Sequence, residues 1–262
     1  RDFWQLYPKA ISRSENGELS LGLLPELPAD QYAQHTDPKL KTQHYYWFRD
    51  GAYQVPCGVA LSHDILFHFA SPDQSPDTVA AQWQATRLLA AEPEHYCASG
   101  ALMDIAPEKE GLFTSFQDYV RRGLARINDA RERVREYSYM NFGDWYGERG
   151  VNWGNQEYDL QWGLLLQFAR SGDLAFFDRA EEASRHMAAV DIINASPQQN
   201  QVGRVHIHGL GHTGGFGMER VPGSEFWIDS GGHDIGHTWT QGTYATYCLT
   251  GSLDFVAGGF VG

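Results

Sequence analysis

The sequence predicts an α+β fold in which a portion of an antiparallel β-sandwich is followed by part of an α/α toroid built from helical hairpins. Strand patterns with tight turns fill the first 70 residues, helical patterns dominate afterwards, and one helical segment recurs later in the chain. We therefore expect two units: residues 1–70, part of a β-sandwich, and residues 71–262, an incomplete toroid.

Composition narrows the classes of function. With 42% hydrophobic residues the 262-residue chain can form a packed core, and no run of 18 apolar residues indicates a membrane span. The lack of such a run predicts no membrane partner, and the net charge of −13, from 33 acidic and 20 basic residues, has the wrong sign for neutralising phosphates and predicts no nucleic-acid partner. The three cysteines show no CxxC spacing and predict no zinc ribbon.

Two hairpins and a third strand are predicted in the first unit. Asn16-Gly17 is a tight-turn signal between residues 11–14 and 18–23, and Asp50-Gly51 separates residues 44–48 from 52–55 in the same way. Residues 64–69 follow as an apolar strand pattern.

Helical signals begin after a linker at residues 71–77, which is rich in Ser, Pro and Asp. Asp77 is a candidate N-cap for a helix over residues 78–91. Residues 115–136 have apolar side chains at mostly helical spacing and predict a long amphipathic helix.

An internal repeat is the strongest organisational feature. Matching residues recur 79 positions later, and each copy predicts a helix, a Ser/Thr-Gly break and a second helix, which is typical of a solenoid or a closed toroid. The first copy has Gly163, Phe168, Ser171, Gly172, Leu174 and Phe176; the second has Gly242, Tyr247, Thr250, Gly251, Leu253 and Phe255.

Five of the eleven histidines fall between positions 206 and 237 and predict a functional site. His206 and His208 lie on one face if their segment is extended, and His212 follows among glycines. His233 and His237 flank Asp234, a candidate N-cap of the second repeat's helix, where the helix dipole favours an anion.

Three chemistries could use this cluster. Histidines can hold a transition metal, so a divalent metal is possible here, although the spacing is not HExxH and we assign no metal ligand. Histidine and tyrosine can perform acid–base chemistry on a sugar acid. A glycosidase carboxylate pair could be drawn from Asp144, Glu148, Asp229 and Asp234.

A second polar and aromatic segment precedes the first repeat. It contains Asp144, Trp145, Tyr146, Trp153 and Asn155 and ends where the first repeated helix begins. Since Asn155 corresponds to Asp234 in the repeat, we expect the two loops to open on the same mouth of a toroid. Aromatic side chains beside glycine loops suit a cleft that stacks on sugars.

At these residues the chain resembles the exo-rhamnogalacturonan lyase / YetA-like family. The resembling stretches are residues 3–10 (Phe-Trp-Gln-Leu-Tyr-Pro-Lys-Ala), Phe142-Gly143-Asp144-Trp145, Val205-His206-Ile207-His208, His212-Thr213-Gly214-Gly215, Gly236-His237-Thr238-Trp239 and Leu249-Thr250-Gly251. The resemblance implies β-domains followed by a toroid that carries the active site. The chain lacks an initiating Met and ends after an apolar stretch, so we expect a fragment of a larger protein.

The resemblance implies β-elimination in a uronic-acid polysaccharide such as rhamnogalacturonan. The substrate carboxylate must be neutralised, a base must remove the C5 proton, and an acid must protonate the departing O4. The expected catalytic residues are His208, His212, His237, Tyr244 and Tyr146, with His208 or His212 as base and Tyr244 or Tyr146 as acid. Substrate contacts are expected from Arg204, His206, His233, Asp234, Asp144, Trp145, Trp153, Asn155 and Trp239.

Two other functions compete with the lyase. One is a glycoside hydrolase on an α/α toroid, with Asp144 and Asp234 roughly 5–10 Å apart across a cleft. The other is a non-catalytic carbohydrate-binding protein. All three take a polysaccharide or oligosaccharide as partner, and we expect an extracellular or periplasmic rather than a cytoplasmic location.

Overall fold

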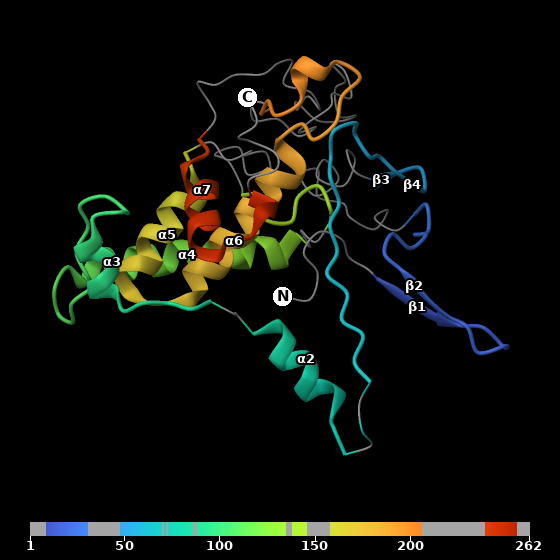
Figure 1. Cartoon of the computed structure of the whole chain (residues 1–262), viewed down its shortest axis with the longest axis horizontal. Helices are drawn as coiled ribbons and strands as arrows, with labels where there is room; N and C mark the ends of the chain where they lie inside the picture. Colours follow the sequence, from blue (N-terminus) through green and yellow to red (C-terminus); the bar gives the residue numbers. More distant parts are fainter. Residues whose placement is uncertain are drawn as a thin grey trace.

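The computed structural model describes residues 9–30, 48–69, 71, 73–85, 88–134, 138–145, 158–205 and 239–255. Within these ranges the fold mixes helices with small antiparallel sheets, and the strands precede the helices along the chain, as the sequence predicted (Figure 1). The division into units at residue 70 stays a prediction. None of the helices in the described ranges has the length and apolar character that a membrane span requires.

The first hairpin forms where the sequence predicted it. β1 (Ala10–Arg13) pairs antiparallel with β2 (Leu19–Gly22), and Gly17 adopts a φ of 89° in the turn between them. The positive φ explains the glycine, because a side chain there would be strained. The predicted Asn16-Gly17 turn is therefore confirmed.

The second hairpin is short. β3 (Phe48–Arg49) pairs with β4 (Ala52–Tyr53), and Asp50 and Gly51 both have positive φ, as a type I′ turn requires. The part of this hairpin predicted over residues 44–47 lies outside the described residues. The described strands form two separate two-stranded sheets.

The prediction of a third strand is wrong. Residues 64–69 have no regular secondary structure, and no described strand pairs with them. The apolar pattern is not buried, since the exposed fraction is 76% for Phe67 and 96% for Phe69. Without a neighbouring ladder, alternation of apolar residues is not enough to form a strand.

The first helices differ from prediction at their ends. α2 (Pro76–Gln84) begins after Ser75 rather than Asp77, with Pro76 in the first turn, and it ends well before residue 91. α3 (Pro93–Ser99) was not predicted and ends at Gly100 with φ 67°. α4 (Thr114–Val134) confirms the amphipathic helix expected over residues 115–136.

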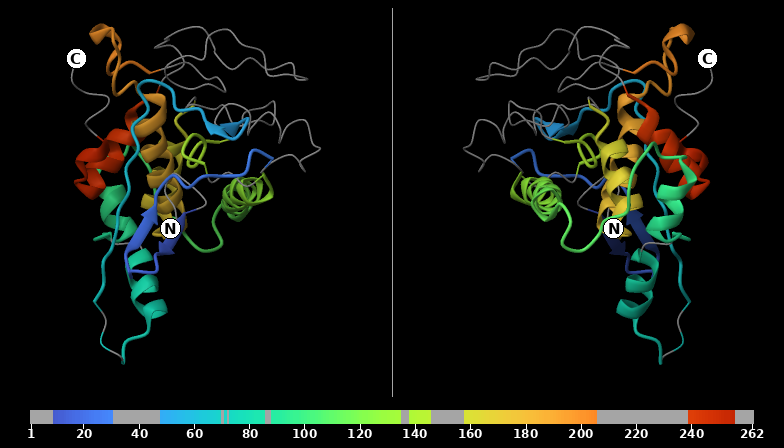
Figure 2. Two further views of the ribbon diagram at one scale, coloured as in Figure 1. Left: turned by 90° about the vertical axis from the view of Figure 1, so that its right-hand side faces the viewer. Right: turned by 90° about the vertical axis from the view of Figure 1, so that its left-hand side faces the viewer.

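The helical core lies between α5 (Leu160–Ser171), α6 (Leu174–His186) and α7 (Gln241–Thr250), which pack together in Figures 1 and 2. α6 continues into a π-helical turn, η1 (Met187–Asp191), and two short 3-10 turns follow, η2 (Gln199–Gln201) and η4 (Leu253–Phe255). The buried apolar residues of this core are Leu124, Leu164, Leu165, Phe168, Phe176, Phe177, Ala180 and Ala245.

The two copies of the repeat share their local geometry. α5 ends at Gly172 (φ 72°) and α7 at Gly251 (φ 69°), and in each case the glycine N–H donates to a helix carbonyl at 2.7 Å. The equivalent residues Phe176 and Phe255 are both buried, at 2% and 1% exposure. The copies also lie side by side, because α7 contacts α5 and η4 contacts α6.

Candidate functional site

Three aromatic side chains form a row where α5 and α7 begin. The Tyr158 ring stacks on Trp239, with centroids 5.9 Å apart and planes 22° apart, and meets Trp145 edge-on at 6.3 Å. Tyr158 and Trp239 each stand two positions before their helix, and Tyr158 is 71% exposed. We call Trp145, Tyr158 and Trp239 the aromatic row. Tyr158 and Trp239 expose ring surface to solvent, and Trp145 is partly buried beside them.

Asp159 fixes the two helix starts that carry the row. Its carboxylate accepts hydrogen bonds from Trp162 N at 3.2 Å, within α5, and from Gly242 N at 3.1 Å, within α7. Burial raises the pKa of Asp159, while these backbone hydrogen bonds act in the opposite direction. One carboxylate therefore caps two helices and holds Tyr158 near Trp239.

A groove of about 350 Å³ adjoins the row between α4 and α5. Apolar side chains form most of its wall, and Gln167 and Asp159 add polar groups. The described lining residues are Val120, Gly123, Leu124, Ile127, Trp145, Tyr158, Asp159, Leu160, Gly163, Leu164, Gln167 and Phe176. An apolar wall with few polar groups and aromatic rings at one side is typical of a small-molecule or sugar site.

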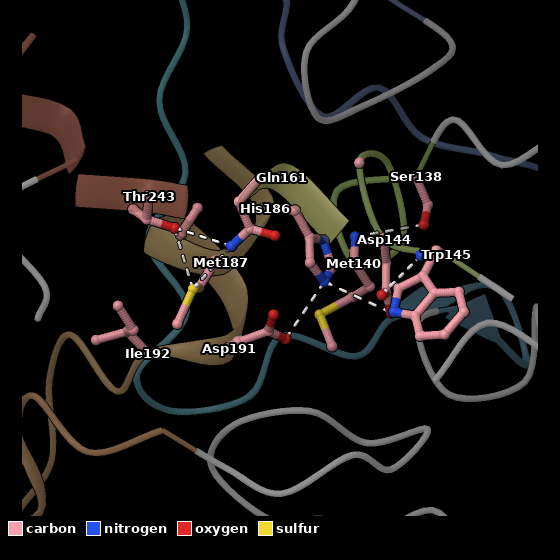
Figure 3. A network of polar contacts seen from close by, with 12 residues as sticks. Ser138, Met140, Asp144, Trp145, Gln161, His186, Met187, Asp191, Ile192 and Thr243 are labelled. Atoms are coloured by element: carbon pink, nitrogen blue, oxygen red, sulfur yellow. Dashed lines mark hydrogen bonds and ion pairs between the residues drawn. The ribbon is translucent and has the colours of Figure 1, made fainter. Parts of the chain in front are cut away.

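A buried charged cluster supports the segment that ends in Trp145. His186, at the end of α6, has its Nε2 3.3 Å from Asp191 Oδ1 and 3.7 Å from Asp144 Oδ2. Figure 3 shows the imidazole between the two carboxylates, with Trp145 beside Asp144. Burial lowers the pKa of His186, but the charges of Asp191 and Asp144 outweigh it, so the pKa lies above the ordinary value. The two carboxylates thus favour the imidazolium form of His186 over the neutral form.

Residues 138–145 form a buried loop, and α6 supplies hydrogen-bond partners for it. Arg179 Nη1 donates to the carbonyl of Gly143 at 2.9 Å, and Nη2 donates to that of Asp144. A buried carbonyl needs such a donor, because water cannot reach it. Glu182 lies 2.6 Å from Arg131 and 3.4 Å from Arg179, so an ion pair joins α4 to α6 beside the arginine that holds the loop.

The structure brings together only some of the predicted site residues. Trp145 and Trp239 meet through Tyr158 in the aromatic row. Asp144 is 1% exposed and its carboxylate faces His186, so it belongs to the buried cluster rather than to the groove wall. Arg204 and Tyr244 are exposed and are not among the described residues that line the groove.

The remaining predicted residues lie outside the described residues: His206, His208, His212, His233, Asp234, His237, Tyr146, Trp153 and Asn155. Their roles, and the Asp144–Asp234 separation that a hydrolase requires, therefore stay predictions. In the described ranges, no group of three His, Cys, Asp or Glu side chains has the geometry to hold a metal ion. The divalent metal considered at the histidine cluster concerns residues outside those ranges.

Sequence reasoning missed Tyr158, Asp159, Arg179, His186 and Asp191. Asp159 carries a recognisable signal, since it directly precedes an apolar helical run and Asp is a favoured N-cap. His186 and Asp191 stand close in sequence, but their approach to Asp144 depends on how the loop packs on α6.

Comparison with known proteins relates the chain to a bacterial protein. The chain is 24% identical over 212 residues to the uncharacterized protein YetA from Bacillus subtilis (strain 168). The match covers 73% of this chain and 25% of YetA, so the chain spans about a quarter of that relative. No protein-family model matches the chain. The resemblance to YetA-like proteins thus has weak support from sequence similarity, and the name of that relative states no activity.

Proposed function

We propose that this chain is the sugar-binding and catalytic part of a polysaccharide lyase that cleaves a uronic-acid polysaccharide, such as rhamnogalacturonan, by β-elimination. The observation that carries the proposal is the aromatic row beside the groove. The apolar faces of sugar rings pack on aromatic rings, and Tyr158 and Trp239 leave ring surface exposed for that purpose, with Trp145 beside them.

The stacking of the repeats supports a toroid as the scaffold. In an array of helical hairpins each repeat packs on its neighbour, which is how α7 and η4 lie against α5 and α6. The row stands at one end of this array, beside the starts of two neighbouring helices. Tyr158 and Trp239 each lie a few positions after one of the two segments that the sequence predicted to open on one mouth, residues 141–155 and 232–237.

In the proposed reaction, a base takes the C5 proton of a uronosyl residue and an acid protonates the leaving O4, which creates a C4–C5 double bond without adding water. The proposal assigns the base to His208 or His212 and the acid to Tyr244 or Tyr146, and gives carboxylate binding to Arg204 with the segment from Asp234 to His237. The aromatic row would hold the sugar in register with these groups.

The test follows the ultraviolet absorbance of the new double bond when the full-length protein is incubated with rhamnogalacturonan and with homogalacturonan. A rise on either polymer supports the proposal. No rise on any uronate polymer rejects the lyase. Binding of the polymer without a rise would instead favour the non-catalytic carbohydrate-binding protein, and new reducing ends without absorbance would favour the hydrolase.

The role of the aromatic row is tested separately by Tyr158→Ala and Trp239→Ala, with Tyr119→Ala as matched control. Tyr119 is 69% exposed on α4 and does not line the groove, so its removal exposes no new core. We expect each row variant to weaken oligosaccharide binding roughly tenfold, or about 1.4 kcal/mol, in isothermal titration. Wild-type affinity in both row variants would reject the row as the sugar platform.

A further inference from the structure

A second and larger groove lies on another part of the molecule. It has a volume of about 790 Å³ and runs between the β1–β2 hairpin, residues 62–66, the end of α2 and one face of α6. It shares no described lining residue with the groove at the aromatic row. Its described lining residues are Lys9, Ile11, Leu21, Leu23, Ser62, His63, Asp64, Ile65, Leu66, Trp83, Gln84, Ala85, Phe177, Glu181, Arg185 and Thr250.

Lys9 is a half-buried cation at this groove. Its Nζ donates to the carbonyl of Leu23 at 3.1 Å and contacts His63 Nδ1 at 3.2 Å. An ammonium group can only donate, so Nδ1 of His63 must be the unprotonated ring nitrogen. Burial and the charge of Lys9 lower the pKa of His63 by more than the neighbouring Asp64 raises it, which agrees with a neutral acceptor. Two of the three ammonium protons are thereby used.

The charge of Lys9 has no counter-ion among the described residues, since no carboxylate oxygen there lies within ion-pair distance of its Nζ. The other cation of the groove differs, because Arg185 lies 3.3 Å from Glu181 and 3.2 Å from Asp254. Burial lowers the pKa of Lys9 to about 8, so its ammonium form is only modestly favoured at neutral pH. A bound anion would raise the pKa of Lys9 again and so favour its ammonium form.

We propose that this groove is a binding site for a ring-sized organic carboxylate, whose carboxylate takes the third proton of Lys9 while its ring packs against Trp83 and the neighbouring aliphatic side chains. The volume suits a ligand of that size, and the wall combines apolar side chains around Trp83 with the charged anchor Lys9. Of the two carboxylates in the wall, Glu181 is paired with Arg185 and Asp64 lies beside His63. The site is independent of the aromatic row. That the carboxylate belongs to a uronic acid is an extension that rests on the proposed function.

The experiment is a calorimetric titration with galacturonate, galactose and acetate, carried out on the Tyr158→Ala background so that the aromatic row does not contribute. We expect galacturonate to bind much more tightly than galactose, which lacks the carboxylate, or acetate, which lacks the ring. Equal binding of galactose or acetate would overturn the proposal.

Lys9→Met, Lys9→Arg and Lys109→Met supply the matched variants. Lys109 is exposed on a loop, so its substitution removes the same charge outside the groove. We expect Lys9→Met to weaken galacturonate binding at least tenfold, while Lys9→Arg and Lys109→Met retain it. A Lys9→Met protein that is folded by circular dichroism and binds like its parent would overturn the proposal.

The pH dependence gives a second readout that a purely structural lysine would not produce. The affinity of the parent protein should fall about tenfold per pH unit once the pH exceeds the Lys9 pKa of about 8, because the ammonium is lost. Lys9→Arg should remove this fall, since a guanidinium stays charged. A flat profile in the parent would count against the proposal. The elimination assay is measured apart from these titrations, so the two proposals can fail separately.

Discussion

Gly163 and Gly242 occupy equivalent positions in the two repeats, yet substitution by alanine should have opposite effects. Gly163 lies in α5, and a Cβ built there meets nothing within 4 Å. Alanine is the better helix former, so Gly163→Ala should raise the free energy of unfolding by about 0.5–1 kcal/mol.

At Gly242 the backbone is equally helical, but α7 approaches α5 too closely for a side chain. A Cβ there would lie 2.5 Å from Asp159 Oδ1 and would overlap Gln161 Cγ and Trp162 N. Moving α7 away also breaks the hydrogen bond from Gly242 N to Asp159. Overpacking costs about 1–3 kcal/mol, and a hydrogen bond to a charged group contributes about 1.5–3 kcal/mol. After the helix-propensity gain, Gly242→Ala should lose about 2–5 kcal/mol.

Urea denaturation of the two variants and the parent, followed by far-ultraviolet circular dichroism, measures both changes. The Gly163→Ala midpoint should move up and the Gly242→Ala midpoint down at unchanged slope. If both variants shift in the same direction, α7 does not pack on α5 as closely as described, and the shared cap at Asp159 is refuted.

Two further predictions concern the buried loop and the charged cluster. Gly143 has a φ of 100°, and a Cβ there would overlap the Glu182 carbonyl and lie 2.8 Å from His186 Cβ. Gly143→Ala should therefore unfold at a lower urea concentration than the control Gly100→Ala. Gly100 also has a positive φ, but a Cβ there would meet nothing within 4 Å. Because the pKa of His186 is raised in the folded state, its contribution to stability is complete below the ordinary value of about 6.5 and is lost as the pH rises through the folded-state pKa. The stability of the parent should fall over that window, and His186→Gln should remove this part of the slope. An unchanged slope in His186→Gln would show that its imidazole is not held protonated by Asp144 and Asp191.

Features that depend on neighbours within a few residues were predictable from the sequence. The Asn16-Gly17 turn and the helix ends at Gly172 and Gly251 follow from glycine's access to positive φ, which is a property of the local chain. The long helix over residues 114–134 follows from helical spacing of its apolar residues. The strand at residues 64–69 failed for the complementary reason, because a strand requires a partner that the local pattern does not contain.

The sequence alone indicated the repeat and the main turns through residue type and spacing, and Trp145 and Trp239 were expected as substrate contacts. Only the tertiary structure decided that Tyr158 joins those two rings and that Asp159 caps a helix 83 positions away. It also decided that Gly242, but not Gly163, must lack a side chain. These outcomes depend on distances between segments remote in sequence, and packing fixes such distances only when the whole core assembles.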